Sequence, residues 1–379
     1  MKRVVILGGG TGGAIAANQM VRQLRAEIEA GEVEVTVISN SDQHVYQPLF
    51  LYLAFDLTLP ADTKRPERRV LDRHIQIVYG EAERVDRQER LVVMADGTRV
   101  AYDFLVIATG SRPAPEQIEG LVEGGHHFYT EEAALKLRDA LQTFTGGRVV
   151  IVVGVPHKCP VAPLEFTFML QDWLDARGLG SSSQIVYTYP IGRPHSLEGV
   201  AEWVKPVFER RRIESHIFFN PEVVDPVNHT VTGLEGDVLS YDLLVAIPPH
   251  VGQDVIGRSG LGDSGNWVPT DRYSLLMQGA EDIYVLGDAT NLPISKAGST
   301  AHFQADVVAQ NIVHRLHGGY GSHRYDGKVF CFIETGLQEA TYITFDYERP
   351  PQPVPPGSLL HLYKVAFNRM YWLSAAGLL

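Results

Sequence analysis

Cys159 and Cys331 are the only two cysteines of the chain and the residues best suited to redox chemistry. Two cysteines cannot form the disulfide framework of a 379-residue protein. In a reducing compartment, a pair that does bridge is more often catalytic than structural. Cys159 lies in the loop 154–160, directly after the apolar residues 149–153. The alternative is a pair of inert buried thiols, because free cysteine is among the most buried residue types.

A glycine-rich turn near the N-terminus has the spacing of a dinucleotide-binding loop. Gly8, Gly10 and Gly13 form a G-x-G-x-x-G pattern after the apolar residues 4–7. Residues 14–28 then have helical character. Between a strand and a helix, such glycines permit a tight turn and let backbone N–H groups approach a pyrophosphate. The pattern predicts a dinucleotide site, and a glycine-rich turn without a ligand is the alternative.

A repeated pattern indicates that the chain has two similar halves. The run Tyr-Asp-Phe-Leu-Val-Ile-Ala at residues 102–108 is echoed by Tyr-Asp-Leu-Leu-Val-Ala-Ile at residues 241–247. Each run closes a segment that opens on an apolar strand, at residues 4–7 and 149–153. Two nucleotide-binding folds explain this most simply, although buried parallel strands resemble one another in any case.

A third apolar run, residues 282–290, contains Gly287 and Asp288 and precedes a helical stretch over residues 300–316. A carboxylate at the carboxyl end of a strand can accept a hydrogen bond from a ligand hydroxyl. Asp288 could equally cap the helix that follows.

The second half lacks the glycine-rich turn of the first. Its loop 154–160 has a single glycine, and Pro156 and Pro160 remove backbone donors. We therefore expect no nicotinamide nucleotide in this half, and a cysteine stands at the end of the strand where ligands bind in such folds.

Length, composition and charge exclude several classes of protein. A chain of 379 residues suits about two domains of roughly 100–200 residues. Its 33 basic and 45 acidic residues give a net charge of −12 without a long basic run, so we expect no nucleic-acid binding. We also expect no metal site, no membrane-spanning helix and no export signal.

A proline-rich linker, residues 349–356, separates the C-terminal segment from the rest. Residues 359–379 are rich in Leu, Phe, Tyr and Trp, with Lys364 and Arg369 interspersed. This segment is too short and too charged to span a bilayer. It could lie in the membrane interface or pack on the protein or a second subunit, and both interpretations stay open.

Together these motifs resemble the flavoproteins with two dinucleotide domains, and in particular the sulfide:quinone oxidoreductase family. The resemblance is carried by Cys-Pro-x-Ala-Pro-x-Glu at 159–165, by residues 287–289 and 296–298, and by residues 328–334 around Cys331. It runs over nearly the whole chain in the expected order. It implies an FAD enzyme that oxidises sulfide to sulfur or polysulfide at a cysteine pair and passes the electrons to a membrane quinone.

The resemblance also implies residue roles. Cys331 would lie nearer the flavin and Cys159 would be its outer partner, so that hydrosulfide attacks their disulfide. Glu165 is a candidate acid or base, and its alternative is a first-turn glutamate favoured by the helix dipole. The implied FAD-binding residues are Gly8, Gly10, Thr11, Gly13, Ser39, Asn40, Ala82, Thr109, Gly110, Gly287, Asp288 and Lys296.

An apolar, aromatic slot for the quinone is implied as well. The candidates for its lining are Phe330, Phe332, Phe367 and Tyr371. Aromatic residues at such spacing are also typical of a simple hydrophobic core. His195 stands at the position of a family histidine, and a loop histidine without a role is the alternative.

The chain departs from the family pattern at three points. Many members have a third cysteine near residues 124–129, which this chain lacks. The strand that should end in an acidic residue for the FAD ribose ends in Ser39 and Asn40, which hydrogen-bond without charge. The related flavocytochrome subunit anchors its flavin through an early cysteine, and residues 43–49 contain none.

We therefore predict an α/β protein with two Rossmann-like domains and a C-terminal membrane-facing segment. Residues 1–112 and 270–324 form the FAD domain, 113–269 the second domain with Cys159, and 325–379 the quinone and membrane segment. We expect a peripheral protein on the cytoplasmic side of the cell membrane, with a homo-oligomer left open. One alternative is a type II NADH:quinone oxidoreductase, and another is the flavin-binding partner subunit of a flavocytochrome sulfide dehydrogenase.

Overall fold

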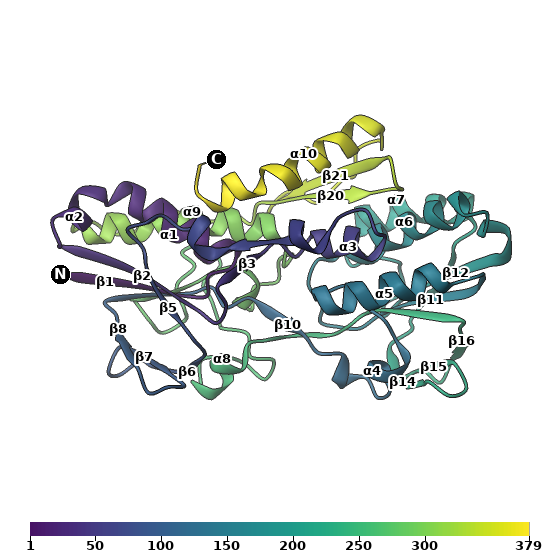
Figure 1. Cartoon of the computed structure of the whole chain (residues 1–379), viewed down its shortest axis with the longest axis horizontal. Coiled ribbons are helices and arrows are strands. Elements are labelled where there is room, and N and C mark those ends of the chain that lie inside the picture. Colours follow the sequence, from purple (N-terminus) through teal and green to yellow (C-terminus); the bar gives the residue numbers. More distant parts are fainter. Residues whose placement is uncertain (379) are drawn as a thin grey trace.

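Two parallel sheets, one toward each end of the long axis, form the framework of the computed structural model, which describes residues 1–378 (Figure 1). In spatial order, the first sheet consists of β19 (Ile283–Val285), β9 (Phe104–Ile107), β1 (Lys2–Leu7), β2 (Val33–Ser39) and β5 (Gln76–Tyr79). The second consists of β13 (Glu214–Ile217), β12 (Ser183–Tyr189), β11 (Gly147–Val153) and β17 (Leu243–Ile247). The α/β class expected from the sequence is confirmed.

Every neighbouring pair of strands in the two sheets is parallel. Val4 of β1 pairs with Val35 of β2 on one side and with Phe104 of β9 on the other. The central strands are buried on both faces, which explains why they are continuous apolar runs rather than alternating ones. Because parallel strands end at the same edge, the turns that follow β1, β9 and β19 meet there.

Helices cover the faces of both sheets. On the first sheet α1 and α9 pack against each other, and in Figure 1 they lie side by side although nearly 300 residues separate their starts. On the second sheet α6 packs against β11 and β12. The helices are α1 (Thr11–Gln23), α2 (Arg25–Glu29), α3 (Leu49–Ala54), α4 (Leu121–Gly124), α5 (Glu131–Thr143), α6 (Ala162–Ala176), α7 (Glu198–Arg211), α8 (Asp254–Arg258), α9 (Gly298–Leu316) and α10 (Ser358–Ala375).

The sequence repeat has a counterpart in the structure. A three-stranded antiparallel sheet precedes β9, and another precedes β17. They consist of β6 (Ala82–Asp86), β7 (Leu91–Met94) and β8 (Arg99–Ala101), and of β14 (Pro221–Asp225), β15 (Thr230–Gly233) and β16 (Val238–Ser240). Short antiparallel pairs complete the fold, namely β3 (Gln43–Val45) with β4 (Lys64–Pro66), and β10 (Ser111–Pro113) with β18 (His250–Gly252).

The C-terminal segment lies across both halves. It consists of β20 (Val329–Glu334), β21 (Ala340–Phe345) and α10, drawn in yellow-green and yellow along the top of Figure 1. Tyr371 and Trp372 of α10 enter the core of the first sheet, whereas Cys331 and Ile333 of β20 belong to the core of the second. Within residues 1–378, no helix has both the length and the apolar character that crossing a membrane requires.

Candidate redox and cofactor site

The glycine-rich turn after β1 has no space for a side chain at Gly8 or Gly13, but it has open space beside Gly10 where a ligand could lie. Gly8 has φ +114°, and a Cβ added there would overlap the carbonyl oxygen of Ala108. A Cβ added at Gly13 would overlap the carbonyl oxygen of Gly8. A Cβ at Gly10, in contrast, would meet nothing within 4 Å. Helix α1 begins at Thr11 without a side-chain cap or an acidic residue in its first turn, so its first N–H groups are free to face an anion. The turn fits a pyrophosphate.

Two further turns lie at the same sheet edge. Thr109 and Gly110 follow β9, and the Thr109 Oγ1 atom is buried and has no hydrogen-bond partner among residues 1–378. Gly287 and Asp288 follow β19 in the short helix η5 (Gly287–Ala289). The Asp288 carboxylate accepts a hydrogen bond from Ser111 Oγ at 3.2 Å. A buried hydroxyl without a partner at the carboxyl end of a strand is what a polar ligand would satisfy.

Lys296 connects this edge to the loop that carries Cys159. Its Nζ donates to the carbonyl oxygens of Asp288 at 3.1 Å and Thr290 at 2.6 Å, and its own carbonyl accepts from the Cys159 N–H at 3.0 Å. Burial lowers the pKa of Lys296 to about 8, although the nearby Asp288 and Asp263 charges oppose the shift. Lys296 is therefore a half-buried cation between the two parts of the site.

Three other cofactor candidates lie at different depths. Ser39 is buried at the end of β2, and its hydroxyl donates to the Ser41 carbonyl at 3.0 Å. Asn40 is exposed. Ala82 is buried in the core between the first sheet and β6–β7. Their roles in binding FAD stay predictions.

Cys331 belongs to a buried cluster, and the half-buried Cys159 packs against the same cluster, although 172 positions separate the two cysteines. Cys159 precedes α6 and has φ +54°, and Cys331 lies opposite Ile343 in the β20–β21 hairpin. Burial is the main cause that raises the pKa of Cys331, and the charge of Cys159 is the next, so the two sulfurs lie within electrostatic range. Burial also raises the pKa of Cys159 to about 12. Both are free thiols in this structure, and a disulfide between them stays a prediction.

A buried ion pair adjoins the cysteines. Glu165, in the first turn of α6, accepts hydrogen bonds from Lys364 Nζ and from the Glu334 N–H, the latter at 2.8 Å. Burial raises the pKa of Glu165, and the Lys364 charge opposes the shift. Burial alone would lower the pKa of Lys364, but the Glu165 and Glu334 charges outweigh it and the pKa is raised, so Lys364 stays a cation.

The polar groups continue from this ion pair toward the surface. Glu334 is fully buried and accepts from the Tyr52 hydroxyl at 2.5 Å and from His361 Nδ1 at 3.0 Å. The His361 side chain is 20% exposed. The Glu334 backbone thus bonds to the Glu165–Lys364 pair, and its carboxylate bonds to the partly exposed His361.

Sequence reasoning did not assign roles to Lys364, Glu334 or His361. Two signals were available: a glutamate at the end of the otherwise apolar run 329–333, and polar residues at positions 361, 364 and 368 on one face of an apolar helix. Helical spacing of three and four places such residues together, and here that face is the inner one.

Three of the four quinone candidates form an aromatic cluster. The ring centroids of Phe330 and Phe332 lie 4.9 Å apart, and those of Phe332 and Phe367 lie 6.1 Å apart. Phe367 is 48% exposed. This cluster joins the cysteine-bearing strand β20 to the outer face of α10.

Tyr371 has a different environment. Its hydroxyl bonds to Thr11 Oγ1 at 2.8 Å and donates to His44 Nε2 at 2.6 Å, while His44 Nδ1 donates to the Gly9 carbonyl at 2.9 Å. Its ring stacks on Tyr46 with centroids 3.8 Å apart. Tyr371 therefore ties α10 to the glycine-rich turn.

The loop 154–160 offers no second cradle of that kind. A Cβ at Gly154 would lie 2.6 Å from Pro249 Cδ, so Pro249 packs directly against the single glycine of this loop. His195 is fully buried and fixes the loop, because its Nε2 donates to the Pro160 carbonyl at 2.9 Å and its Nδ1 accepts from the Leu197 N–H at 3.0 Å. Burial lowers the pKa of His195 to about 4, so it is a neutral, structural group. Among residues 1–378, no cluster of His, Cys, Asp and Glu side chains could hold a metal ion.

Comparison with known proteins finds a matching family model and relatives described as sulfide:quinone oxidoreductases. A family model described as pyridine nucleotide-disulphide oxidoreductase matches residues 2–305. The mitochondrial sulfide:quinone oxidoreductase of Mus musculus is 25% identical over 360 residues, which cover 92% of this chain and 79% of that protein. The sulfide-quinone reductase of Aquifex aeolicus is 24% identical, with 98% of this chain and 90% of that protein covered.

Solved structures and a second group of relatives complete the comparison. The X-ray structure of the sulfide:quinone oxidoreductase from Aquifex aeolicus matches with a TM-score of 0.88 and 23% identity, covering all of this chain and 92% of that one. An NADH dehydrogenase-like protein of Bacillus subtilis is 22% identical over 84% of this chain and 85% of that protein.

Proposed function

This chain belongs to the pyridine nucleotide-disulphide oxidoreductase family, and from that premise we propose that it is a sulfide:quinone oxidoreductase. It is an oxidoreductase and its cofactor is FAD. The observation that carries the proposal is the packing of Cys159 against the buried cluster that contains Cys331, beside the ion pair of Glu165 and Lys364. Two sulfurs beside a carboxylate and a cation suit an anionic sulfur nucleophile.

For the cofactor, the turn after β1 receives the pyrophosphate and the neighbouring turns receive the remaining polar groups. We assign this function to Gly8, Gly10, Thr11, Gly13, Ser39, Asn40, Ala82, Thr109, Gly110, Gly287, Asp288 and Lys296. Bound FAD would supply the two-electron carrier between the cysteine pair and the quinone. Lys296, a cation at the strand edge, would favour negative charge on its ligand.

The sulfide step is a thiol–disulfide exchange. Hydrosulfide attacks one sulfur of a Cys159–Cys331 disulfide, a new S–S bond forms, and the bridging bond breaks. One cysteine becomes a persulfide and the other leaves as a thiolate. A second hydrosulfide attacks the outer sulfur of the persulfide, breaks its S–S bond and carries that sulfur away as a polysulfide. Its cysteine leaves as a thiolate, so the two electrons taken from sulfide stay on the reduced cysteine pair until bound FAD would accept them. When neutral H₂S enters, its proton goes to the Glu165 carboxylate, whose charge acts on Cys159.

The quinone is proposed to approach from the side of α10. Phe330, Phe332 and Phe367 provide aromatic surface there. Tyr371 instead fixes the inner face of α10 to the glycine-rich turn through Thr11. The outward face of α10 is apolar, with exposed side chains at Leu359, Leu362, Tyr363, Phe367, Met370 and Leu373. Its inward face carries Lys364 and Asn368.

The apolar outer face and polar inner face of α10 support peripheral membrane attachment. A helix on a water-exposed surface ordinarily turns its apolar stripe inward, and an exposed apolar patch marks an interaction site. A lipid surface that dissolves the quinone fits such a face, and we place it at the cytoplasmic side of the cell membrane. A face between two copies of the chain would expose the same residues, and liposome binding separates the two.

A type II NADH:quinone oxidoreductase is the second candidate, favoured by the Bacillus subtilis relative. To decide, the anaerobic holoenzyme is mixed with sulfide and, separately, with NADH, while the flavin absorbance is followed. We expect sulfide to bleach the flavin and a quinone to restore its colour. Bleaching by NADH but not by sulfide would overturn the proposal. Co-purification of a haem protein that is required for turnover would instead support the flavocytochrome alternative.

A further inference from the structure

The end of strand β2 lacks the residue that usually holds a dinucleotide ribose. In Rossmann folds an acidic side chain at this point accepts hydrogen bonds from the ribose hydroxyls. Here the strand ends in Ser39, which is buried, and Asn40, which is exposed. The charged acceptor expected there is therefore missing from β2 itself.

A carboxylate reaches the same place from another element. Glu67 is the first residue of the short helix η2 (Glu67–Arg69), which directly follows β4. A Cβ added to Gly9, inside the glycine-rich turn, would overlap the Glu67 carboxylate and would lie 3.0 Å from Ser39 Oγ. The Glu67 side chain thus lies between the turn after β1 and the end of β2.

The carboxylate is buried and incompletely satisfied. Glu67 is 1% exposed, and within residues 1–378 its Oε2 atom has no hydrogen-bond partner. Burial raises the pKa of Glu67 to about 7, and the neighbouring Ser39 hydroxyl only partly offsets this. A buried acceptor without a donor is costly, so a group that donates to it in the assembled protein explains its retention.

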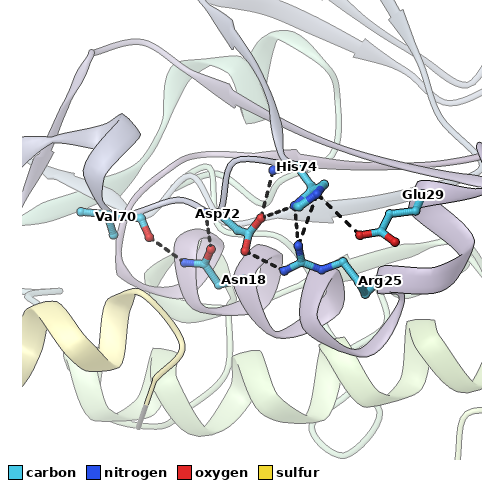
Figure 2. A network of polar contacts seen from close by, with 6 residues as sticks. All are labelled: Asn18, Arg25, Glu29, Val70, Asp72 and His74. Atoms are coloured by element: carbon cyan, nitrogen blue, oxygen red, sulfur yellow. Dashed lines mark hydrogen bonds and ion pairs between the residues drawn. The ribbon is translucent and has the colours of Figure 1, made fainter.

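The backbone holds Glu67 firmly in this position. Its N–H donates to the Asp42 carbonyl at 2.7 Å, and its carbonyl accepts from the Val70 N–H at 2.9 Å. The residues that follow are fixed to α1 and α2 by the network in Figure 2. There Asn18 bonds to the Val70 carbonyl at 3.0 Å and to the Asp72 N–H at 2.8 Å, and Arg25 pairs with Asp72 at 3.0 Å. Such preorganisation is expected of a binding group.

We propose that Glu67 is the ribose-binding carboxylate of the FAD site, accepting hydrogen bonds from the hydroxyls of the adenosine ribose in place of the acidic residue absent from β2. The ligand class follows from geometry, because the position between a glycine-rich turn and the end of the second strand is where that ribose lies in dinucleotide-binding folds. The inference rests on FAD binding and not on the sulfide reaction, so loss of sulfide activity leaves it unaffected.

The test compares binding of FAD with binding of two FAD analogues that lack the 2′- or the 3′-hydroxyl of the adenosine ribose. Apoprotein is titrated with each, and quenching of flavin fluorescence gives the dissociation constant. We expect the wild-type protein to bind FAD about tenfold more tightly than at least one analogue, as for one hydrogen bond to a charged group. Equal affinities for all three ligands would overturn the proposal without any variant.

Two variants test whether Glu67 causes the preference for FAD over its deoxy analogues. Glu67→Gln should reduce the preference to less than about threefold, because the carboxylate is lost while the shape is kept. Asp42→Asn, which removes an exposed carboxylate close by, should leave the preference unchanged. If Glu67→Gln keeps the full preference, or weakens FAD and both analogues equally, Glu67 does not bind the ribose.

Discussion

At the scale of single residues, the chemistry of the sulfur site depends on buried charge. Burial raises the pKa of both thiols, which opposes formation of the thiolates that the reaction needs. Lys364 counteracts the shift at both cysteines, whereas Glu165 adds to it. The two members of one ion pair therefore affect the thiols with opposite sign.

Replacing Lys364 with Met should make the thiols harder to ionise. Without the cation the pKa of Cys159 and Cys331 rises further, so the pH dependence of alkylation of the reduced protein moves to higher pH. Sulfide-driven flavin reduction at pH 7 should slow by roughly tenfold or more. Lys205→Met, at an exposed position of α7, is the control. An unchanged or acid-shifted alkylation profile in the Lys364 variant would show that its charge does not reach the sulfurs.

Replacing Glu165 with Gln should have the opposite effect on the thiols and still impair turnover. Removal of the carboxylate lowers the pKa of Cys159 and Cys331, so alkylation begins at lower pH. If Glu165 moves a proton during sulfide oxidation, turnover falls by about a hundredfold despite the more reactive thiols. Faster alkylation together with unimpaired turnover would leave Glu165 a purely electrostatic role.

At the scale of elements, α10 has two faces with different functions. Its inner face supplies Lys364 to the sulfur site and Tyr371 to the glycine-rich turn, and its outer face exposes apolar side chains. The sequence suggested two alternative environments for this segment, the membrane interface or the surface of the protein or of a second subunit. The packing against the protein is observed, and the membrane contact remains our proposal.

The outer face should be needed for membrane binding and dispensable for folding. Changing Leu362 and Met370 to Glu together should weaken binding to liposomes at least about tenfold, because each apolar side chain contributes roughly 1.5–3 kcal/mol when it leaves water. FAD content should be unchanged. Val227→Glu, at an 84% exposed position elsewhere, is the control. If the double variant binds liposomes like the wild type but changes from dimer to monomer, the face is a contact between copies.

The tether between α10 and the glycine-rich turn can be tested with Tyr371→Phe. The change removes the hydroxyl that bonds to Thr11 and leaves His44 Nε2 without its donor. Stability toward denaturant should fall by about 1–3 kcal/mol. The KM for quinone should change little. A raised KM with unchanged stability would instead make Tyr371 a quinone-binding residue.

At the scale of the whole molecule, reactive groups from remote parts of the chain are assembled by two sheets and one C-terminal segment. Strand β11 delivers the loop with Cys159, and the hairpin β20–β21 delivers Cys331 into the same core. The C-terminal segment packs into the cores of both halves. The site therefore assembles only when both halves and this segment have packed together.

How much could be anticipated from the sequence follows from the range of the interactions. The glycine-rich turn and the apolar strands are local patterns, so Gly8, Gly13 and the central strands could be recognised directly. The neighbours of Glu165 and Glu67 could not be recognised in this way. Lys364 lies 199 positions from Glu165, and Glu67, which follows the β3–β4 pair, contacts the distant turn at Gly9. Nothing in the local sequence encodes such long-range contacts.

The most direct test of the account is the state of the two cysteines before and after sulfide. The aerobically purified holoenzyme is alkylated without reductant, digested and analysed by mass spectrometry, then treated anaerobically with sulfide and analysed again. We predict a cross-linked peptide pair joining Cys159 to Cys331, which disappears with sulfide as one cysteine gains a sulfur atom and the flavin is bleached. Two freely alkylated cysteines before treatment, with the flavin still reduced by sulfide and no sulfur gained at either residue, would contradict the account.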